Sequence, residues 1–271
     1  MEETWIKLDL EASKRKQRTY MDPRSRYRVF TSYGLGQRED CCGCGCRHCP
    51  FGHRKVSSES RKKIRQNPWI EGEPITSTDF DVVSWSGGKD SYLALRMLQK
   101  EARRPLLLMT TFDGRSENVA HQDVLISKII EQAHHLKLPL LLIPLYSEQP
   151  YLTRIEQGLA LVVQKHRIHR LTFGDLHLEY IRSWREKELL SLMKKYHFEL
   201  HFPLWNLDYD VLLQELQNSN VQCSISAVPN EECKKRVCIG DVFDADLIKK
   251  LPPEVDTFGE HGEFHTYVSF L

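Results

Sequence analysis

Residues 80–92 read FDVVSWSGGKDSY, and this stretch joins a strand-like apolar run to the start of a helical pattern. Glycines allow the backbone to approach an anion closely and to adopt positive φ. N–H groups at a helix start supply donors and partial positive charge, and the lysine adds a full charge. The stretch therefore predicts a phosphate-binding loop formed by Ser86, Gly87, Gly88, Lys89, Asp90 and Ser91. A glycine turn with a helix-capping Asp or Ser is the simpler alternative.

Strand-like and helix-like runs alternate on both sides of this loop. We expect strands at residues 80–85, 106–112, 138–145, 170–173 and 199–202, and helices at residues 92–98, 121–136, 151–165 and 179–196. Such alternation gives a parallel sheet with helices on both faces. Sheets of this type bind ligands beyond the carboxyl ends of strands, where the strand order switches. The pattern predicts a doubly wound, mostly parallel α/β domain over residues 76–271, with a small N-terminal cysteine-rich module.

The first 72 residues carry the excess positive charge of the chain. They hold 16 Lys and Arg against 9 Asp and Glu, whereas the remaining residues hold 22 against 28. A basic head of this kind could meet nucleic acid such as tRNA, and a solvated arm has the same composition. We expect residues 1–40 to form a basic, partly disordered arm and residues 57–75 to form a linker.

Cysteines gather in one short segment between the arm and the linker. Residues 41–56 read CCGCGCRHCPFGHRKV and hold five of the eight cysteines of the chain. In a reducing compartment, thiolates of this density ligate zinc or an iron-sulfur cluster. We expect a metal module whose ligands are Cys42, Cys44, Cys46, Cys49 and His48. Free or redox-active thiols are the alternative. The string resembles a small cysteine-rich module of unassigned function, over about residues 26–56.

The sequence predicts neither a membrane span nor a secretory signal. The apolar run at residues 138–145 is far shorter than the roughly 20 residues that cross a bilayer, and it contains Pro139 and Pro144. The N-terminus lacks the apolar stretch of a signal peptide. We therefore expect a cytoplasmic protein with no membrane partner.

The segment SGGKDS at residues 86–91 is similar to the signature of the PP-loop ATP pyrophosphatases. That resemblance implies an adenine nucleotide alpha hydrolase-like fold, with the loop gripping the pyrophosphate portion of ATP. It also implies that Mg²⁺ accompanies ATP and that the substrate is adenylated. Asp113, at the end of the second strand, would then lie near the adenine and belong to the nucleotide site.

Further segments resemble the diphthine-ammonia ligase family, and with the loop they span the body of the chain. They are Gly174-Asp175, Arg182, the sequence FPLW at residues 202–205 and the sequence GEHGEFHT at residues 259–266. The resemblance implies an AMP-forming ligase that adenylates an acceptor carboxylate and transfers it to ammonia, releasing AMP and pyrophosphate. The acceptor that it implies is protein-borne, a diphthine on elongation factor 2.

The residue roles follow from the same resemblance together with the chemistry of the side chains. Amide formation needs an adenylated carboxylate and a base that accepts protons from ammonia. We assign catalytic roles to Lys89, Asp90, Asp175, Glu263 and His265. We assign acceptor binding to Gly174, Arg182, Glu260 and Glu263. Glu260, Glu263 and His265 are expected to face the SGGKDS loop.

Two departures from the family pattern keep other functions open. Residues 117–123 replace a Ser-Tyr-Met segment of the family, and His261 stands where the family has an asparagine. One alternative is a PP-loop enzyme that modifies tRNA by thiolation and uses the basic cysteine head to bind it. The other alternative is a non-catalytic protein that only binds a nucleotide.

Overall fold

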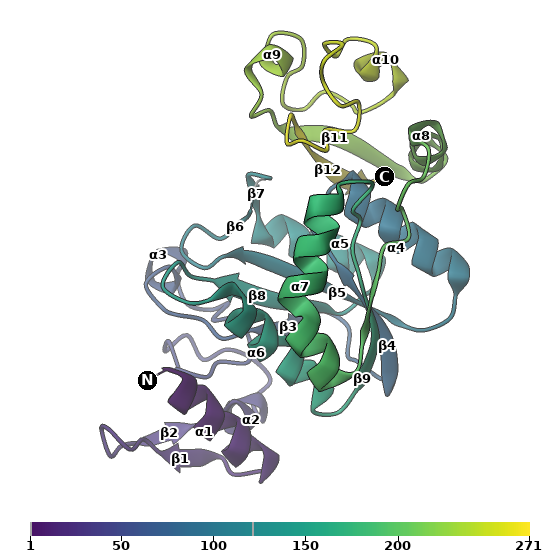
Figure 1. The fold of residues 1–271 in the computed structure, drawn as a ribbon. Helices are drawn as coiled ribbons and strands as arrows, with labels where there is room; N and C mark the ends of the chain where they lie inside the picture. The colour runs from purple at the N-terminus through teal and green to yellow at the C-terminus, as the bar shows by residue number, and fades with distance from the viewer. Residues whose placement is uncertain (1, 121) are drawn as a thin grey trace.

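A mostly parallel sheet forms the centre of the molecule in the computed structural model, which describes residues 2–120 and 122–271 (Figure 1). Five parallel strands lie in the order β8-β5-β4-β9-β10. Their bounds are β4 Asp79–Ser84, β5 Leu106–Asp113, β8 Leu140–Leu145, β9 Arg167–Thr172 and β10 Glu199–His201. The prediction of a mostly parallel α/β sheet is therefore confirmed.

Helices cover both faces of this sheet because its strands are apolar on both sides. Val83 and Leu108 face one core, which includes residues of α4 and α5. Val82 and Leu107, their neighbours in the chain, face a second core with residues of α6 and α7. The four helices are α4 Lys89–Glu101, α5 Ile126–Leu136, α6 Tyr151–Val163 and α7 Glu179–Tyr196. A strand that is buried on both faces has a continuous run of apolar residues in its sequence.

The segment before α5 differs from the expected helix over residues 121–136. Residues Asn118–Val119 and Val124–Leu125 form the short antiparallel strands β6 and β7, and α5 begins only at Ile126. The N–H of Ile126 donates to the carbonyl of Glu117 at 2.8 Å, which closes this hairpin. The first residue of the expected helix, His121, lies outside the described residues.

The first 40 residues, which we expected to be partly disordered, contain regular structure. They form α1 Glu2–Lys14, the antiparallel pair β1 Thr19–Met21 and β2 Arg28–Phe30, and α2 Ser32–Gly36. The buried carboxylate of Asp9 ties α1 to α2, since it accepts the N–H and the hydroxyl of Ser32, each at 2.7 Å. The expectation of disorder rested on the many basic residues of this segment, and composition does not reveal such contacts.

The expected linker, residues 57–75, also contributes to the fold. It contains the short helix α3 Ser58–Arg61 and the strand β3 Trp69–Glu71, which pairs antiparallel with β8. Trp69 is buried, with 6% of its surface exposed. The segment therefore forms one edge of the central sheet.

A C-terminal unit lies at the opposite end of the sheet domain from the N-terminal residues (Figure 1). It consists of α8 Tyr209–Gln217, β11 Val221–Ala227, α9 Glu231–Lys234, α10 Ala245–Ile248 and β12 His265–Phe270. Strands β11 and β12 pair antiparallel in a sheet of their own. Among the described residues, no helix is both long and apolar enough to cross a membrane.

Candidate functional site

The loop over residues 86–91 connects the carboxyl end of β4 to α4, and its glycines are required by space and conformation. Gly87 has φ +80°, and a Cβ there would lie 2.6 Å from Oε1 of Gln132. Gly88 is the N-cap of α4, and a Cβ there would lie 2.9 Å from the carbonyl oxygen of Thr266. A side chain at either position would push the loop away from its neighbours.

The C-terminal strand β12 anchors this loop. The N–H of Lys89 donates to Oγ1 of Thr266 at 3.0 Å, and the N–H of Val268 donates to the carbonyl of Gly87 at 2.9 Å. The buried amide of Gln132 donates to the carbonyls of Gly87 and Val268 at 3.0 and 2.6 Å. The N–H of Lys89, at the start of α4, is thus used to hold the loop in place.

The side chain of Lys89, which we expected to bind phosphate, is buried, with 3% of its surface exposed. Its ammonium lies 2.8 Å from Oδ2 of Asp90 and sits over the rings of Phe243 and Phe258, 5.7 and 5.2 Å from their centroids. Burial opposes the charge, but the carboxylates of Asp90 and Glu260 hold the pKa of Lys89 above its ordinary value. Lys89 is therefore a buried cation beside acidic groups.

A cavity of about 310 Å³ opens beside the loop, at the carboxyl ends of β4 and β9. The strand order switches between these two neighbours, which is where open α/β sheets bind ligands. The cavity is lined by Ser84, Ser86, Asp90, Ser91, Phe173, Gly174, Asp175, Leu178, Tyr180, Ile181, Arg185 and Glu260. It brings together predicted residues from the loop, from the end of β9 and from the C-terminal segment.

The end of β9 contributes an ion pair and a close backbone contact. Asp175 accepts two hydrogen bonds from Arg185 of α7, at 2.9 Å to Oδ1 and 2.5 Å to Oδ2. The guanidinium of Arg185 also lies over the ring of Phe173, 4.1 Å from its centroid. A Cβ on Gly174 would lie only 2.5 Å from the carbonyl oxygen of Asp90. The glycine therefore lets the strand end touch the loop.

The segment before β12 is folded by its own carboxylates. Glu263 accepts the N–H of Asp256 at 3.1 Å and the N–H of His261 at 2.9 Å. Asp256 in turn accepts the N–H of Phe258 at 2.8 Å and that of Glu260 at 3.2 Å. Glu263 is buried, with 7% of its surface exposed, and both of its oxygens are used within the loop. Glu260 is the carboxylate that the loop presents to the cavity.

Two acids that line this cavity, Asp90 and Glu260, have pKa values raised above their ordinary values, chiefly by burial. Burial first, and then the negative charge of Asp90, raise the pKa of Glu260 to about 8. The carboxylates of Asp256 and Asp175 act in the same direction, whereas Lys89 opposes the shift. At neutral pH this carboxyl group therefore holds a proton, and a nearby cation would release it.

The predicted residues Asp113 and His265 have other roles. Asp113 accepts the N–H groups of Arg115 and Ser116 at 3.0 and 2.6 Å, so it forms the turn that follows β5. His265 is the first residue of β12 and pairs with Ala227 of β11. Neither residue is among those that line the 310 Å³ cavity.

Helix α7 faces the cavity through residues that sequence reasoning missed. The predicted Arg182 pairs with Glu186 at 3.0 Å and lies over the ring of Trp205, 4.8 Å from its centroid. The cavity is lined instead by Leu178 and by Tyr180, Ile181 and Arg185 of this helix. Leu178, Ile181 and Arg185 are spaced by three and four residues, so the helical period after Gly174-Asp175 could have predicted these three but not Tyr180.

The clustered thiols lie in two close pairs. The Sγ atoms of Cys42 and Cys46 are 3.4 Å apart, and those of Cys41 and Cys49 are 3.8 Å apart. The backbone N–H of Cys44 and the thiol of Cys46 lower the pKa of Cys42 to about 7. Within residues 2–120 and 122–271, no three His, Cys, Asp or Glu side chains are placed so that they could hold a metal ion together.

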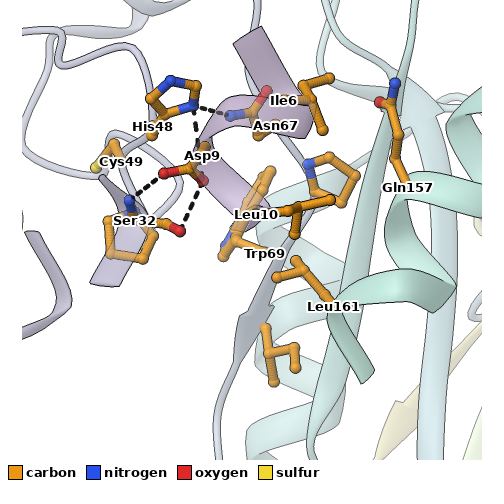
Figure 2. A pocket seen from close by; sticks show the side chains of 13 residues that line it. Ile6, Asp9, Leu10, Ser32, His48, Cys49, Asn67, Trp69, Gln157 and Leu161 are labelled. Atoms are coloured by element: carbon orange, nitrogen blue, oxygen red, sulfur yellow. Dashed lines mark hydrogen bonds and ion pairs between the residues drawn. The ribbon is translucent and has the colours of Figure 1, made fainter. Parts of the chain in front are cut away.

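His48, which we expected to be a metal ligand, contacts Tyr20 and Asn67 through its two ring nitrogens. Its Nε2 lies 2.8 Å from the hydroxyl of Tyr20, and its Nδ1 lies 3.1 Å from the amide nitrogen of Asn67. Figure 2 shows this ring beside Asp9 and Asn67 at a cavity of about 240 Å³ between α1 and the sheet domain. Since each ring nitrogen has a polar neighbour, His48 connects the cysteine segment to Tyr20 of β1 and to Asn67 before β3.

One comparison with known proteins concerns this N-terminal part. Residues 8–55 match the model of a family described as a family of unknown function, DUF5522. The match takes in the second half of α1, the hairpin β1–β2, α2 and all five clustered cysteines. It starts at residue 8 and not near residue 26, which agrees with the contact between α1 and α2. A description without a function assigns no chemistry to the chain.

Proposed function

We propose that this chain is an AMP-forming, ATP-dependent ligase that adenylates an acceptor carboxylate and passes it to ammonia. The cavity at the switch between β4 and β9 carries the proposal, because it joins the SGGKDS loop to the acidic C-terminal segment. The resemblance to PP-loop enzymes supplies the reaction class. The adenine nucleotide alpha hydrolase-like fold belongs to the same proposal.

The loop would bind the phosphates of ATP through its hydroxyls and its lysine. Ser86 and Ser91 line the cavity, and their Oγ atoms lie 3.2 Å apart at the start of α4. Lys89 does not itself line the cavity, but its buried ammonium is held 2.8 Å from the carboxylate of Asp90, which does. Fixed donors and charges in a buried site stabilise charge that develops during phosphate transfer.

The carboxylates of the cavity fit the Mg²⁺ that accompanies ATP. Oδ1 of Asp90 is buried and has no hydrogen-bond partner in the described part of the chain, and Glu260 lines the same cavity. Oxygen ligands of this kind are those that Mg²⁺ prefers. Asp90 would hold the ion, which when bound would neutralise charge on the phosphates.

Glu260 is the best-placed base for the second half of the reaction. Ammonia must lose protons as it attacks the adenylate, and a base is most effective when its pKa lies near the working pH. The pKa of Glu260 is about 8, whereas Glu263 uses both oxygens to fold its own loop. We therefore transfer the proposed role of proton acceptor from Glu263 and His265 to Glu260.

The acceptor is tested by following AMP release with ATP, Mg²⁺, ammonium and one of two substrates. We expect release that requires ammonium and diphthine-bearing elongation factor 2. Release that requires bulk tRNA would favour the tRNA-modifying alternative. Lys89→Gln should abolish release, and Lys187→Gln is the matched control because Lys187 lies exposed on α7.

We also propose that the cysteine module binds zinc or an iron-sulfur cluster through Cys41, Cys42, Cys46 and Cys49. Four thiolates at about 2.3 Å from zinc lie about 3.8 Å from one another. The Cys41–Cys49 pair already has this spacing, and the Cys42–Cys46 pair is slightly closer. The two pairs would converge on the metal, and His48 would stay with Tyr20.

A further inference from the structure

A second cavity, of about 200 Å³, lies where residues 51–71 meet β5 and α5. Its walls include the rings of Phe51, Trp69 and Phe112, and the last two meet edge to face with centroids 5.8 Å apart. It shares no lining residue with the 310 Å³ cavity beside the SGGKDS loop. Flat aromatic walls of this kind suit a flat ligand.

One buried polar side chain in this wall has no partner. Gln66 has 1% of its surface exposed, and neither its amide nitrogen nor its amide oxygen has a hydrogen-bond partner in the described part of the chain. Buried amide groups are almost always bonded, because an unpaired one loses its water without compensation. A group that complements both atoms is therefore expected in the cavity.

Two hydrogen bonds hold the backbone of Gln66 in place. Its N–H donates to the hydroxyl of Tyr146 at 2.8 Å, and its carbonyl accepts from Nη2 of Arg154 at 2.8 Å. Arg154 is itself buried and donates from Nε to the carbonyl of Pro144 at 2.7 Å. The fold thus keeps an unpaired carboxamide at the cavity wall, which is the arrangement of a preorganised binding group.

The charged residues around the cavity are already paired with one another. Arg61 donates from Nη2 to Glu117 at 3.0 Å, and Arg54 lies 3.4 Å from Glu71. These pairs leave little net charge for a ligand to neutralise. The cavity therefore favours an uncharged ring over a phosphate or an amine.

We propose that this cavity binds one uncharged nucleobase against its aromatic wall. An amide side chain pairs with a base edge that presents a donor next to an acceptor, as glutamine does with adenine. Because Trp69 and Phe112 are perpendicular to each other, one face of the base would lie against only one of these rings, and stacking of this kind holds bases of single strands. One bridging water needs about 10–15 Å³, so a single water would leave most of the 200 Å³ unfilled. The proposal is independent of the ATP reaction.

The test is binding of adenosine, guanosine, cytidine and uridine to the full chain, measured by calorimetry. Binding that Gln66→Leu removes belongs to this cavity, because Gln66 does not line the cavity beside the SGGKDS loop. We expect one nucleoside to bind with 1:1 stoichiometry. Gln66→Leu should weaken this binding at least about tenfold and should raise the melting temperature of the unliganded protein, because it removes the unpaired amide. Gln164→Leu, at an exposed position after α6, is the matched control and should change neither value.

A second variant approaches the cavity from its rim. Leu125 lines the cavity and is 52% exposed, so Leu125→Trp can narrow the entrance without altering the core, and it should also block binding. A single-stranded hexanucleotide distinguishes the source: tighter binding than the free nucleoside assigns the site to RNA, and equal binding assigns it to a free nucleoside. No binding to wild type at 1 mM, or equal binding to Gln66→Leu, would overturn the proposal.

Discussion

Glu263→Gln should destabilise the protein because it disturbs the loop that presents Glu260 to the cavity. The wild-type carboxylate accepts two backbone N–H groups, from Asp256 at 3.1 Å and from His261 at 2.9 Å, at a position with 7% exposure. A glutamine can accept only one of them, and its own amide N–H₂ would face the other. Loss of one charge-assisted bond with a buried donor left unpaired costs about 1.5–3 kcal/mol.

Chemical denaturation measures this effect as a lower free energy of unfolding, and thermal unfolding should show a melting temperature lower by roughly 3–12 °C. AMP release should fall with and without ammonium, since Glu260 is displaced from both half-reactions. Glu254→Gln, at an exposed position of the same segment, should leave both measurements unchanged. If Glu263→Gln kept wild-type stability and lost only ammonia-dependent turnover, Glu263 would act on the substrate directly and our account of the loop would be wrong.

Three further changes probe the site and the module. Gly174→Ala should weaken ATP binding at least about tenfold and destabilise the fold by about 1–3 kcal/mol, because the added Cβ would lie 2.5 Å from the carbonyl oxygen of Asp90. Gly36→Ala is the control, since a Cβ at Gly36 would meet no atom closer than 4.0 Å. Because the pKa of Glu260 is raised in the folded protein, its protonated carboxyl stabilises the fold fully at pH values below 4.5, and this stabilisation is lost as the pH rises through about 8. In urea denaturation at a series of pH values, Glu260→Gln should reduce this loss of unfolding free energy. An unchanged pH dependence in the variant would contradict the raised pKa. Anaerobically purified protein should contain stoichiometric zinc or iron that Cys42→Ser removes and Cys238→Ser retains; absence of metal from the wild type would refute the metal module.

The central fold could be predicted because apolar runs and helical periods alternate over the whole body. The strand segment 80–85 and the loop after it are contiguous, so their chemistry is visible without knowledge of distant residues. The order within residues 2–40 was not visible, because it depends on a buried contact between Asp9 and Ser32, 23 residues apart. The β6–β7 hairpin was missed because the run from residue 124 to residue 136 reads as one helix.

The sequence predicted that Glu260 lies near the SGGKDS loop. It did not predict that Glu263 folds its own segment or that Lys89 is buried. The role of Glu263 depends on the backbone path through Gly259 and Gly262, which have φ +72° and +82°. The burial of Lys89 depends on Phe243 and Phe258, more than 150 residues further along the chain. Such contacts follow from tertiary structure, and the sequence of the SGGKDS loop alone does not indicate them.

The bond at which ATP is cleaved tests the central claim most directly. Phosphorus NMR of the full chain with ATP, Mg²⁺, ammonium and diphthine-bearing elongation factor 2 identifies the products without any label on the protein. The account predicts AMP and pyrophosphate in equal amounts, and their loss in Lys89→Gln. Formation of ADP and phosphate, or tight binding of ATP with no turnover under any acceptor, would contradict an adenylating ligase.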